Sequence, residues 1–159
     1  MILIDKYVFQ KLIADVESQE EERCGFLFGN EDEANRTITN LAAVRNSKVD
    51  EKHTSFEITS QDYLCAERIA EEEKMNLLGV YHSHPNHPAF PSEYDRVAAQ
   101  PYFSYIIVSV VNRRFADIRS WQLNNNFEFK EEKLALINQT KNNIYGNYNY
   151  PNTFTKIYK

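Results

Sequence analysis

The chain has 159 residues, 42% of them hydrophobic and 26% charged, which is typical of a single soluble globular domain. A net charge of −5 argues against nucleic-acid binding, which usually needs a basic face. No apolar run approaches the roughly 20 residues that a membrane span requires, and the N-terminus lacks the features of a secretory signal. The two cysteines, Cys24 and Cys65, have no framework spacing, so we expect a reducing cytoplasm.

Three helices are predicted. The first spans 5–17, where Val8, Leu12, Ile13 and Val16 share one face at the helical period. The second spans 59–74 and begins at a Thr-Ser cap, and the third is a short helix at 92–100. A helical turn or two is also expected within 131–139.

Apolar and β-branched runs predict the strands. They are expected at 24–29, 37–46, 54–58, 76–84, 104–112 and 113–124, and 127–130 extends the last strand or pairs with it. This order predicts a mixed α/β (α+β) fold, with a mostly antiparallel sheet flanked by helices. We expect one domain over 1–140 and an irregular C-terminal tail over 141–159.

Three of the four histidines lie close together: His82 and His84 end the strand predicted at 76–84, and His87 follows it. His82 and His84 are two residues apart, and side chains with that spacing on a strand point to the same side. Two imidazole nitrogens could therefore bind one zinc ion, which prefers four ligands in a tetrahedron. A catalytic zinc needs a third protein ligand and leaves its fourth position to water.

A proline-rich loop connects these histidines to the next helix. Pro85 ends the strand, Ser92 opens the helix, and Asp95 lies in its first turn. The loop could bring Asp95 over the histidines as the third ligand. Ser92 and Asp95 also match a capping box, which is a purely structural alternative, and we interpret His87 as a loop residue.

The stretch HSHPNHPAFPSEYD matches the HxHP-x6-SxxD signature of the JAMM metalloproteases, also called the MPN+ or Mov34/MPN family. The segment EERCGFLFG resembles the E-x-C-G-x-L-x-G strand of the same family. The resemblance covers roughly 2–130 and implies an MPN/cytidine-deaminase-like architecture of the compact, stand-alone prokaryotic type.

The resemblance also implies the roles of individual residues. His82, His84 and Asp95 would hold one Zn²⁺ per chain, with water as its fourth ligand. Glu22 would be the general base and acid, taking a proton from that water and passing it to the leaving amine. Ser92 would steady the oxyanion at the scissile carbonyl.

Three other residues near the motifs are interpreted as structural. Cys24 and Cys65 are expected to be buried packing residues, because free cysteines are commonly buried. Tyr81 should point to the face of the sheet opposite the histidines.

The implied activity is a zinc-dependent, deubiquitinase-like hydrolysis of a peptide or isopeptide bond. The bond would follow the C-terminal tail of a ubiquitin-like sulfur-carrier protein, and the tail would bind as an added strand. Three alternatives stay open: a non-catalytic MPN-type scaffold, a protease of a bacterial ubiquitin-like conjugation or defence pathway, and a structural zinc domain closed by Cys24 or His87. Neither nucleic acid nor membrane is an expected partner, and the sequence leaves the oligomeric state open.

Overall fold

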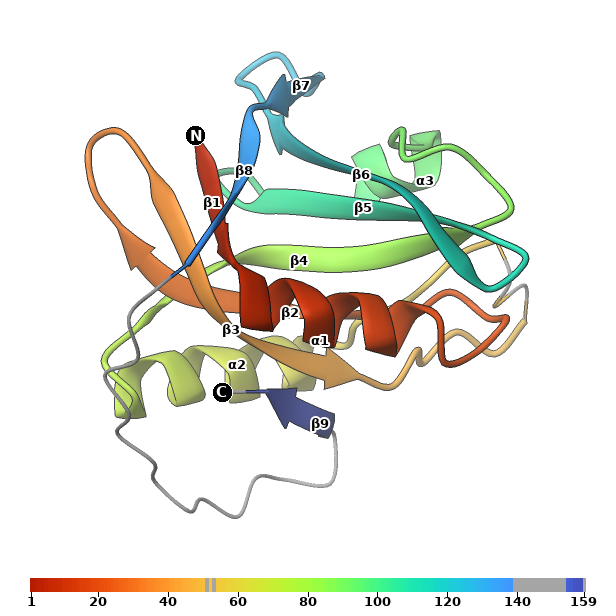
Figure 1. The fold of residues 1–159 in the computed structure, drawn as a ribbon, viewed down its shortest axis with the longest axis horizontal. Helices are drawn as coiled ribbons and strands as arrows, with labels where there is room; N and C mark the ends of the chain where they lie inside the picture. The colour runs from red at the N-terminus through yellow and green to blue at the C-terminus, as the bar shows by residue number, and fades with distance from the viewer. Residues whose placement is uncertain (51, 53, 139–153, 159) are drawn as a thin grey trace.

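The computed structural model describes residues 1–50, 52 and 54–138, together with the backbone of 154–158. Within these residues one nine-stranded sheet forms the central layer, in the order β7-β6-β5-β4-β2-β3-β1-β8, and β9 pairs with β3 (Figure 1). The strands are β1 (Ile2–Asp5), β2 (Cys24–Glu31), β3 (Arg36–Val44), β4 (Asn76–Pro85), β5 (Ser104–Val111), β6 (Arg114–Leu123), β7 (Phe129–Glu132), β8 (Leu134–Ile137) and β9 (Phe154–Tyr158).

Most of the described strand pairs are antiparallel. The parallel ones are β1 with β3, β1 with β8, and β4 with β5. The other pairs, including β2 with β4, are antiparallel. The prediction of a mixed, mostly antiparallel sheet flanked by helices is confirmed.

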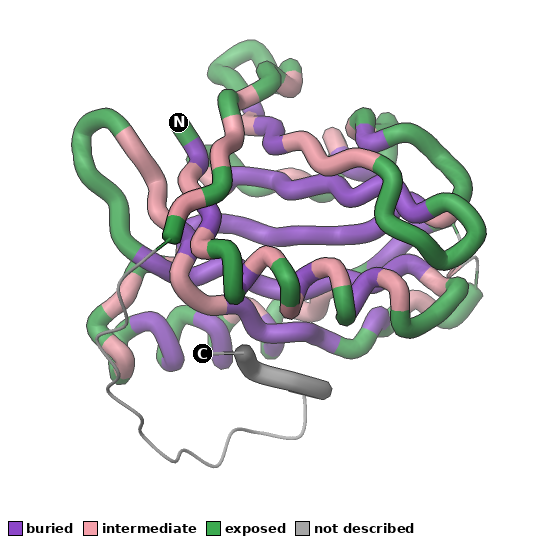
Figure 2. The backbone as a smooth tube through the Cα atoms, viewed as in Figure 1, coloured by how far each residue is buried: buried purple, intermediate pink, exposed green. Residues whose placement is uncertain are grey.

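Helices cover both faces of this sheet (Figure 1). On one face α1 (Lys6–Val16), which is capped by Asp5, buries Val8, Leu12 and Val16. On the other face α2 (Ser60–Glu72) buries Ala66, Ile69 and Ala70, and α3 (Glu93–Ala98) follows the proline-rich loop. The central strands between these layers are almost wholly buried (Figure 2).

Two predicted elements are wrong. The segment 54–58 is not a strand, because its backbone bonds to another loop instead of a strand ladder. The Asn46 side chain donates to the Ser55 carbonyl and accepts from the Glu57 N–H. The Ser47 N–H donates to the Glu57 carbonyl. The helical turn within 131–139 is instead the end of β7 followed by β8. β8 pairs in parallel with β1, a strand that the sequence reading missed, and this long-range pairing outweighs local helix propensity.

The tail is only partly described. β9 lies within the segment expected to be irregular and pairs with β3 from Leu41 to Val44, whereas 139–153 and 159 lie outside the described residues. The domain boundary at 140 stays a prediction.

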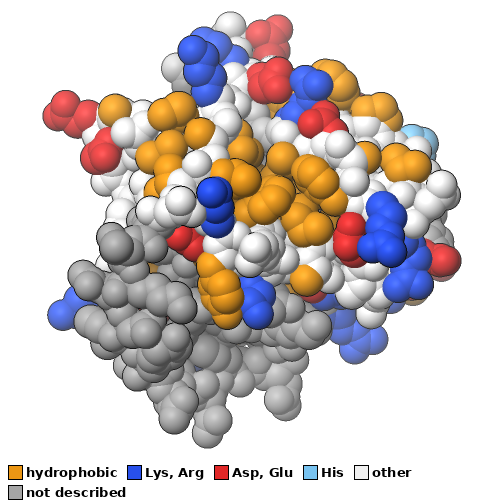
Figure 3. All heavy atoms as spheres, viewed as in Figure 1, with side chains coloured by type: hydrophobic (Ala, Val, Ile, Leu, Met, Phe, Trp, Pro, Cys, Tyr) orange, Lys and Arg blue, Asp and Glu red, His pale blue; other side chains and the backbone are white. Residues whose placement is uncertain are grey.

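Apolar side chains are also exposed on the face that carries α1 (Figure 3). Phe9 packs edge-to-face on Phe115, with 5.7 Å between ring centroids, and Tyr7 is exposed nearby on the same helix. Among the described residues, no helix is both long and apolar enough to cross a membrane.

Candidate metal centre

Strand β4 carries His82 and His84 side by side to the end of the sheet. Both residues are buried, and their Nε2 atoms lie 3.1 Å apart. The residues of β4 alternate between the two faces, since Val80 packs in the core beneath α2 and Tyr81 in the core beneath α1. Both histidines therefore lie on the α2 face.

Asp95 approaches the histidines from α3. Its Oδ1 lies 3.2 Å from His82 Nε2, and its Oδ2 lies 3.5 Å from His84 Nε2. Ligand atoms of a tetrahedral zinc ion, bound at roughly 2.0–2.1 Å, lie about 3.3 Å apart. The spacing of these three groups therefore fits a zinc ion, and they form a group able to hold a metal.

The surroundings of the imidazoles leave both Nε2 atoms directed at this point. His84 Nδ1 lies 2.9 Å from the Pro88 carbonyl, so that nitrogen carries the proton and Nε2 has the free lone pair. His82 stacks on Phe56 at 4.5 Å, and its buried Nδ1 has no hydrogen-bond partner among the described residues. Burial lowers the pKa of His82, which favours the neutral imidazole that a metal requires.

Asp95 is held as a charged carboxylate. Burial alone would raise its pKa, but the charge of His82 and hydrogen bonds from both histidines and Ser92 hold it well below its ordinary value. Burial lowers the pKa of His84 in turn, yet its bonds to Asp95 and Pro88 outweigh this and raise it overall.

Ser92 holds Asp95 in place through the capping box at the start of α3. The Ser92 N–H and hydroxyl both donate to Asp95 Oδ2, each at 2.7 Å, and Ser92 Oγ accepts from the Asp95 N–H at 3.1 Å. The structural alternative is thus present, and the same bonds orient the carboxylate toward the histidines.

Glu22 lies two residues before the start of β2 and is only 5% exposed. Burial raises the pKa of its carboxyl to about 8, while the charge of His84 lowers it and that of Asp95 raises it. Its N–H donates to the Lys52 carbonyl, and its carbonyl accepts from the Asn46 side chain. The structure thus brings Glu22 close enough to interact with the charges of His84 and Asp95, while it stays outside the group of possible ligands.

The loop 86–91 is held by hydrogen bonds to β5 and β6 that the sequence did not predict. Trp121 Nε1 donates to the Ala89 carbonyl, Ser109 Oγ donates to the His87 carbonyl, and Asn86 N–H donates to the Val110 carbonyl. No local signal could have identified these residues, because they bond to the loop backbone from distant strands. The anchored loop sets where α3 begins, and so where Asp95 lies.

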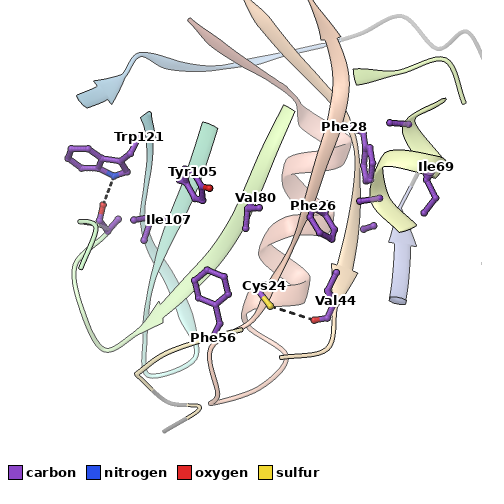
Figure 4. Packing of buried hydrophobic residues seen from close by; sticks show 14 residues of the cluster. Cys24, Phe26, Phe28, Val44, Phe56, Ile69, Val80, Tyr105, Ile107 and Trp121 are labelled. Carbon is purple, nitrogen blue, oxygen red and sulfur yellow. Dashed lines mark hydrogen bonds between the residues drawn. The ribbon is translucent and has the colours of Figure 1, made fainter. Parts of the chain in front are cut away.

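Cys24 and His87 lie outside the clustered group. The Cys24 thiol points to the Val44 carbonyl at 3.8 Å (Figure 4), and burial raises its pKa well above the ordinary value. His87 is exposed on the loop. Cys65 is buried on α2, and the Tyr81 side chain lies on the opposite face of the sheet, both as predicted.

Comparisons with known proteins identify similar chains. A model of the family described as prokaryotic homologs of the JAB domain matches residues 5–124. A desampylase from Pyrococcus furiosus is 27% identical over 135 residues, which cover 85% of this chain and 90% of that protein.

Two solution structures have similar folds. Protein DSY2949 from Desulfitobacterium hafniense matches with a TM-score of 0.76 and 26% identity, covering 87% of this chain and 94% of that one. A protein from Salinibacter ruber matches with a TM-score of 0.66 and 32% identity, covering 86% and 92%. These matches confirm the resemblance that the HxHP and SxxD motifs indicated.

Proposed function

Because the chain belongs to the family of prokaryotic homologs of the JAB domain, we propose that it is a zinc metallopeptidase acting on a ubiquitin-like protein. The observation that carries the proposal is the convergence of His82, His84 and Asp95 beside the buried Glu22. This arrangement would provide an open metal site with an acid–base group next to it.

We assign the metal as Zn²⁺, one per chain. Two imidazoles and one carboxylate are a typical ligand set for catalytic zinc, and their spacing of 3.1–3.5 Å supports it. When bound, zinc would supply a Lewis acid that polarises a carbonyl and lowers the pKa of water toward 7.

Glu22 would accept a proton from the attacking water and deliver it to the leaving amine. Its carboxyl is buried beside the ligand group, and a carboxylate with a raised pKa suits proton transfer near neutral pH. Ser92 would donate its hydroxyl to the oxyanion at the scissile carbonyl, which requires that hydroxyl to turn away from Asp95 Oδ2.

The substrate we propose is a ubiquitin-like sulfur-carrier protein, cleaved at the peptide or isopeptide bond after its C-terminal tail. The desampylase relative supports isopeptidase-like activity on ubiquitin-like proteins. We further propose that residues 1–140 form the catalytic domain and that the enzyme acts in the cytoplasm, where the free thiols of Cys24 and Cys65 would persist.

Two histidine variants test the site. The parent, His84→Ala and His87→Ala are purified, loaded with zinc, analysed for metal and incubated with a ubiquitin-like protein that carries a peptide after its Gly-Gly terminus. We expect about one zinc per chain and cleavage after Gly-Gly in the parent, and loss of both in His84→Ala. His87→Ala is the matched control and should keep its zinc. A parent that binds no zinc would refute the site, and a zinc-loaded parent that leaves every such substrate intact would refute the activity.

A further inference from the structure

A second buried polar cluster lies on the other face of the sheet, directly behind the metal centre. We call Asp15, Arg23, Tyr81 and Ser83 the back-face cluster. Asp15 is fully buried on α1, and its carboxylate accepts from Arg23 Nη2 at 2.8 Å and from the Tyr81 hydroxyl at 2.8 Å. None of these residues is part of the proposed reaction, although Arg23, Tyr81 and Ser83 are each adjacent in sequence to one that is.

The cluster is joined to the catalytic strand through the main chain. Cys24 pairs with His82 in the β2–β4 ladder, and one step further Ser83 N–H donates to the Arg23 carbonyl at 2.9 Å. The return bond is unusual, because Arg23 N–H donates to the Ser83 side-chain oxygen at 2.8 Å. Ser83 lies between the two histidines, and Arg23 directly follows Glu22.

The Arg23 side chain bonds to α1, whereas its backbone bonds to β4. This side chain is 10% exposed and is paired with the wholly buried Asp15. A buried ion pair adds little net stability over well-packed apolar residues, so its value is better sought in the geometry that it imposes. Residue 23 is thus held by its backbone to β4 and by its side chain to α1.

Gly25 is part of this arrangement. A Cβ at this position would come within 2.5 Å of Tyr81 Cε1 and 2.3 Å of the Ala42 carbonyl oxygen. Only glycine leaves room for the Tyr81 ring to lie against β2 and reach Asp15. This contact gives a physical reason for the glycine after Cys24.

We propose that the back-face cluster, acting through the Arg23–Ser83 pairing, positions the Glu22 carboxylate relative to His82 and His84. Arg23, Ser83, Asp15 and Tyr81 are positioning residues in this inference, which rests on the proposed function of Glu22. A misplacement of a catalytic group by about 1 Å can reduce the rate roughly 10²-fold. Loss of the contacts that position Glu22 should therefore have a measurable effect on the rate.

The kinetic test uses Ser83→Ala, which removes the acceptor of the Arg23 N–H, and Ser83→Thr, which keeps a hydroxyl. Ser104→Ala is the matched control. Ser104 is also fully buried and accepts from an arginine, Arg36, but it pairs with Gly79, away from the site. The probe is a ubiquitin-like protein whose Gly-Gly terminus is joined to 7-amino-4-methylcoumarin.

We expect zinc-loaded Ser83→Ala to lose about 10- to 100-fold in kcat while KM and zinc content stay unchanged. Ser83→Thr should recover most of the loss, and Ser104→Ala should lose stability alone. An unchanged kcat in Ser83→Ala, or a loss fully explained by missing zinc, would overturn the inference.

Crystal structures of the parent and Ser83→Ala give a readout that is independent of activity. Glu22 should shift or occupy several conformations in the variant, while the ligand atoms of His82, His84 and Asp95 stay in place. If the parent is inactive on the probe, the proposed function is refuted. If Glu22 keeps its position in Ser83→Ala, the positioning role of the back-face cluster is refuted. If Ser83→Ala does not fold, Tyr81→Phe provides the same comparisons, because it removes one donor to Asp15 and no carbon atom.

Discussion

Glu22 shows how its surroundings change a residue that looks ordinary in the sequence. It ends the run Glu20-Glu21-Glu22, which resembles a solvated turn, and only the E-x-C-G motif distinguishes it from its neighbours. In the structure it is 5% exposed, and burial raises the pKa of its carboxyl to about 8. An ionised Glu22 is therefore destabilising unless a cation lies nearby.

The first prediction concerns the pH dependence of the metal-free protein. The folded-state pKa of Glu22, about 8, lies above its ordinary value of 4.5, so the folded state binds the extra proton between these values. The stability due to this proton is fully present below pH 4.5 and is lost as the pH rises to 8. Since Gln stays neutral, Glu22→Gln should raise the Tm of the metal-free protein at pH 8 by at least about 2–4 °C, the shift for 1 kcal/mol at this size.

Thermal unfolding in a chelator, followed by circular dichroism from pH 5 to 8, measures this effect. Glu21→Gln, a change at the more exposed neighbour, is the control and should follow the parent. An equal pH dependence in the parent and Glu22→Gln would show that Glu22 is not the buried titrating group.

At the level of elements, two helices begin with the same capping motif, but the two motifs have different surroundings. Thr59 and Asp62 form a capping box at α2, and Ser92 and Asp95 form one at α3. Both are visible in the sequence as a hydroxyl residue followed three positions later by Asp. Only the second box points its carboxylate at two histidines, and that difference depends on the loop that leads into α3.

Comparison of the two capping boxes can separate the capping role of the Ser92 hydroxyl from its proposed catalytic role. Ser92→Ala and Thr59→Ala should each lose about 1 kcal/mol of stability, the usual cost of a lost N-cap. Only Ser92→Ala should also lose about 10²–10³-fold in kcat, because it would remove the proposed oxyanion donor as well. Chemical denaturation and cleavage kinetics on the same preparations test this, and equal kcat values in the two variants would restrict Ser92 to capping.

At the level of the whole molecule, the sheet brings together residues from separate segments. The resemblance of 82–95 to the family signature predicted that His82, His84 and Asp95 come together, and the structure does bring them together. The anchors of that loop were not predictable, since Trp121 acts on Ala89 across 32 positions and Ser109 on His87 across 22. The failure at 131–139 has the same cause, because β8 pairs with β1 near the other end of the chain. The segment 54–58 differs, because it bonds to the Asn46 side chain only 9 to 11 positions away, and these bonds replace a strand ladder.

Metal binding should stabilise the entire fold, because its ligands come from β4 and α3. At a free zinc concentration 100 times Kd, a ligand specific to the native state adds about 2.7 kcal/mol. For a domain of this size, the Tm should therefore rise by roughly 5–10 °C. Calorimetry should show this rise in the parent and not in His84→Ala, and an equal rise in both would indicate that zinc binds elsewhere.

The central claim is that Glu22 performs the proton transfer at a zinc site that it does not itself build. Turnover of zinc-loaded Glu22→Gln on a ubiquitin-like protein with a C-terminal extension tests this claim most directly. We predict a full zinc content with kcat reduced about 10²–10⁴-fold, the usual contribution of general acid–base catalysis. A zinc-loaded Glu22→Gln that cleaves as fast as the parent would contradict the account.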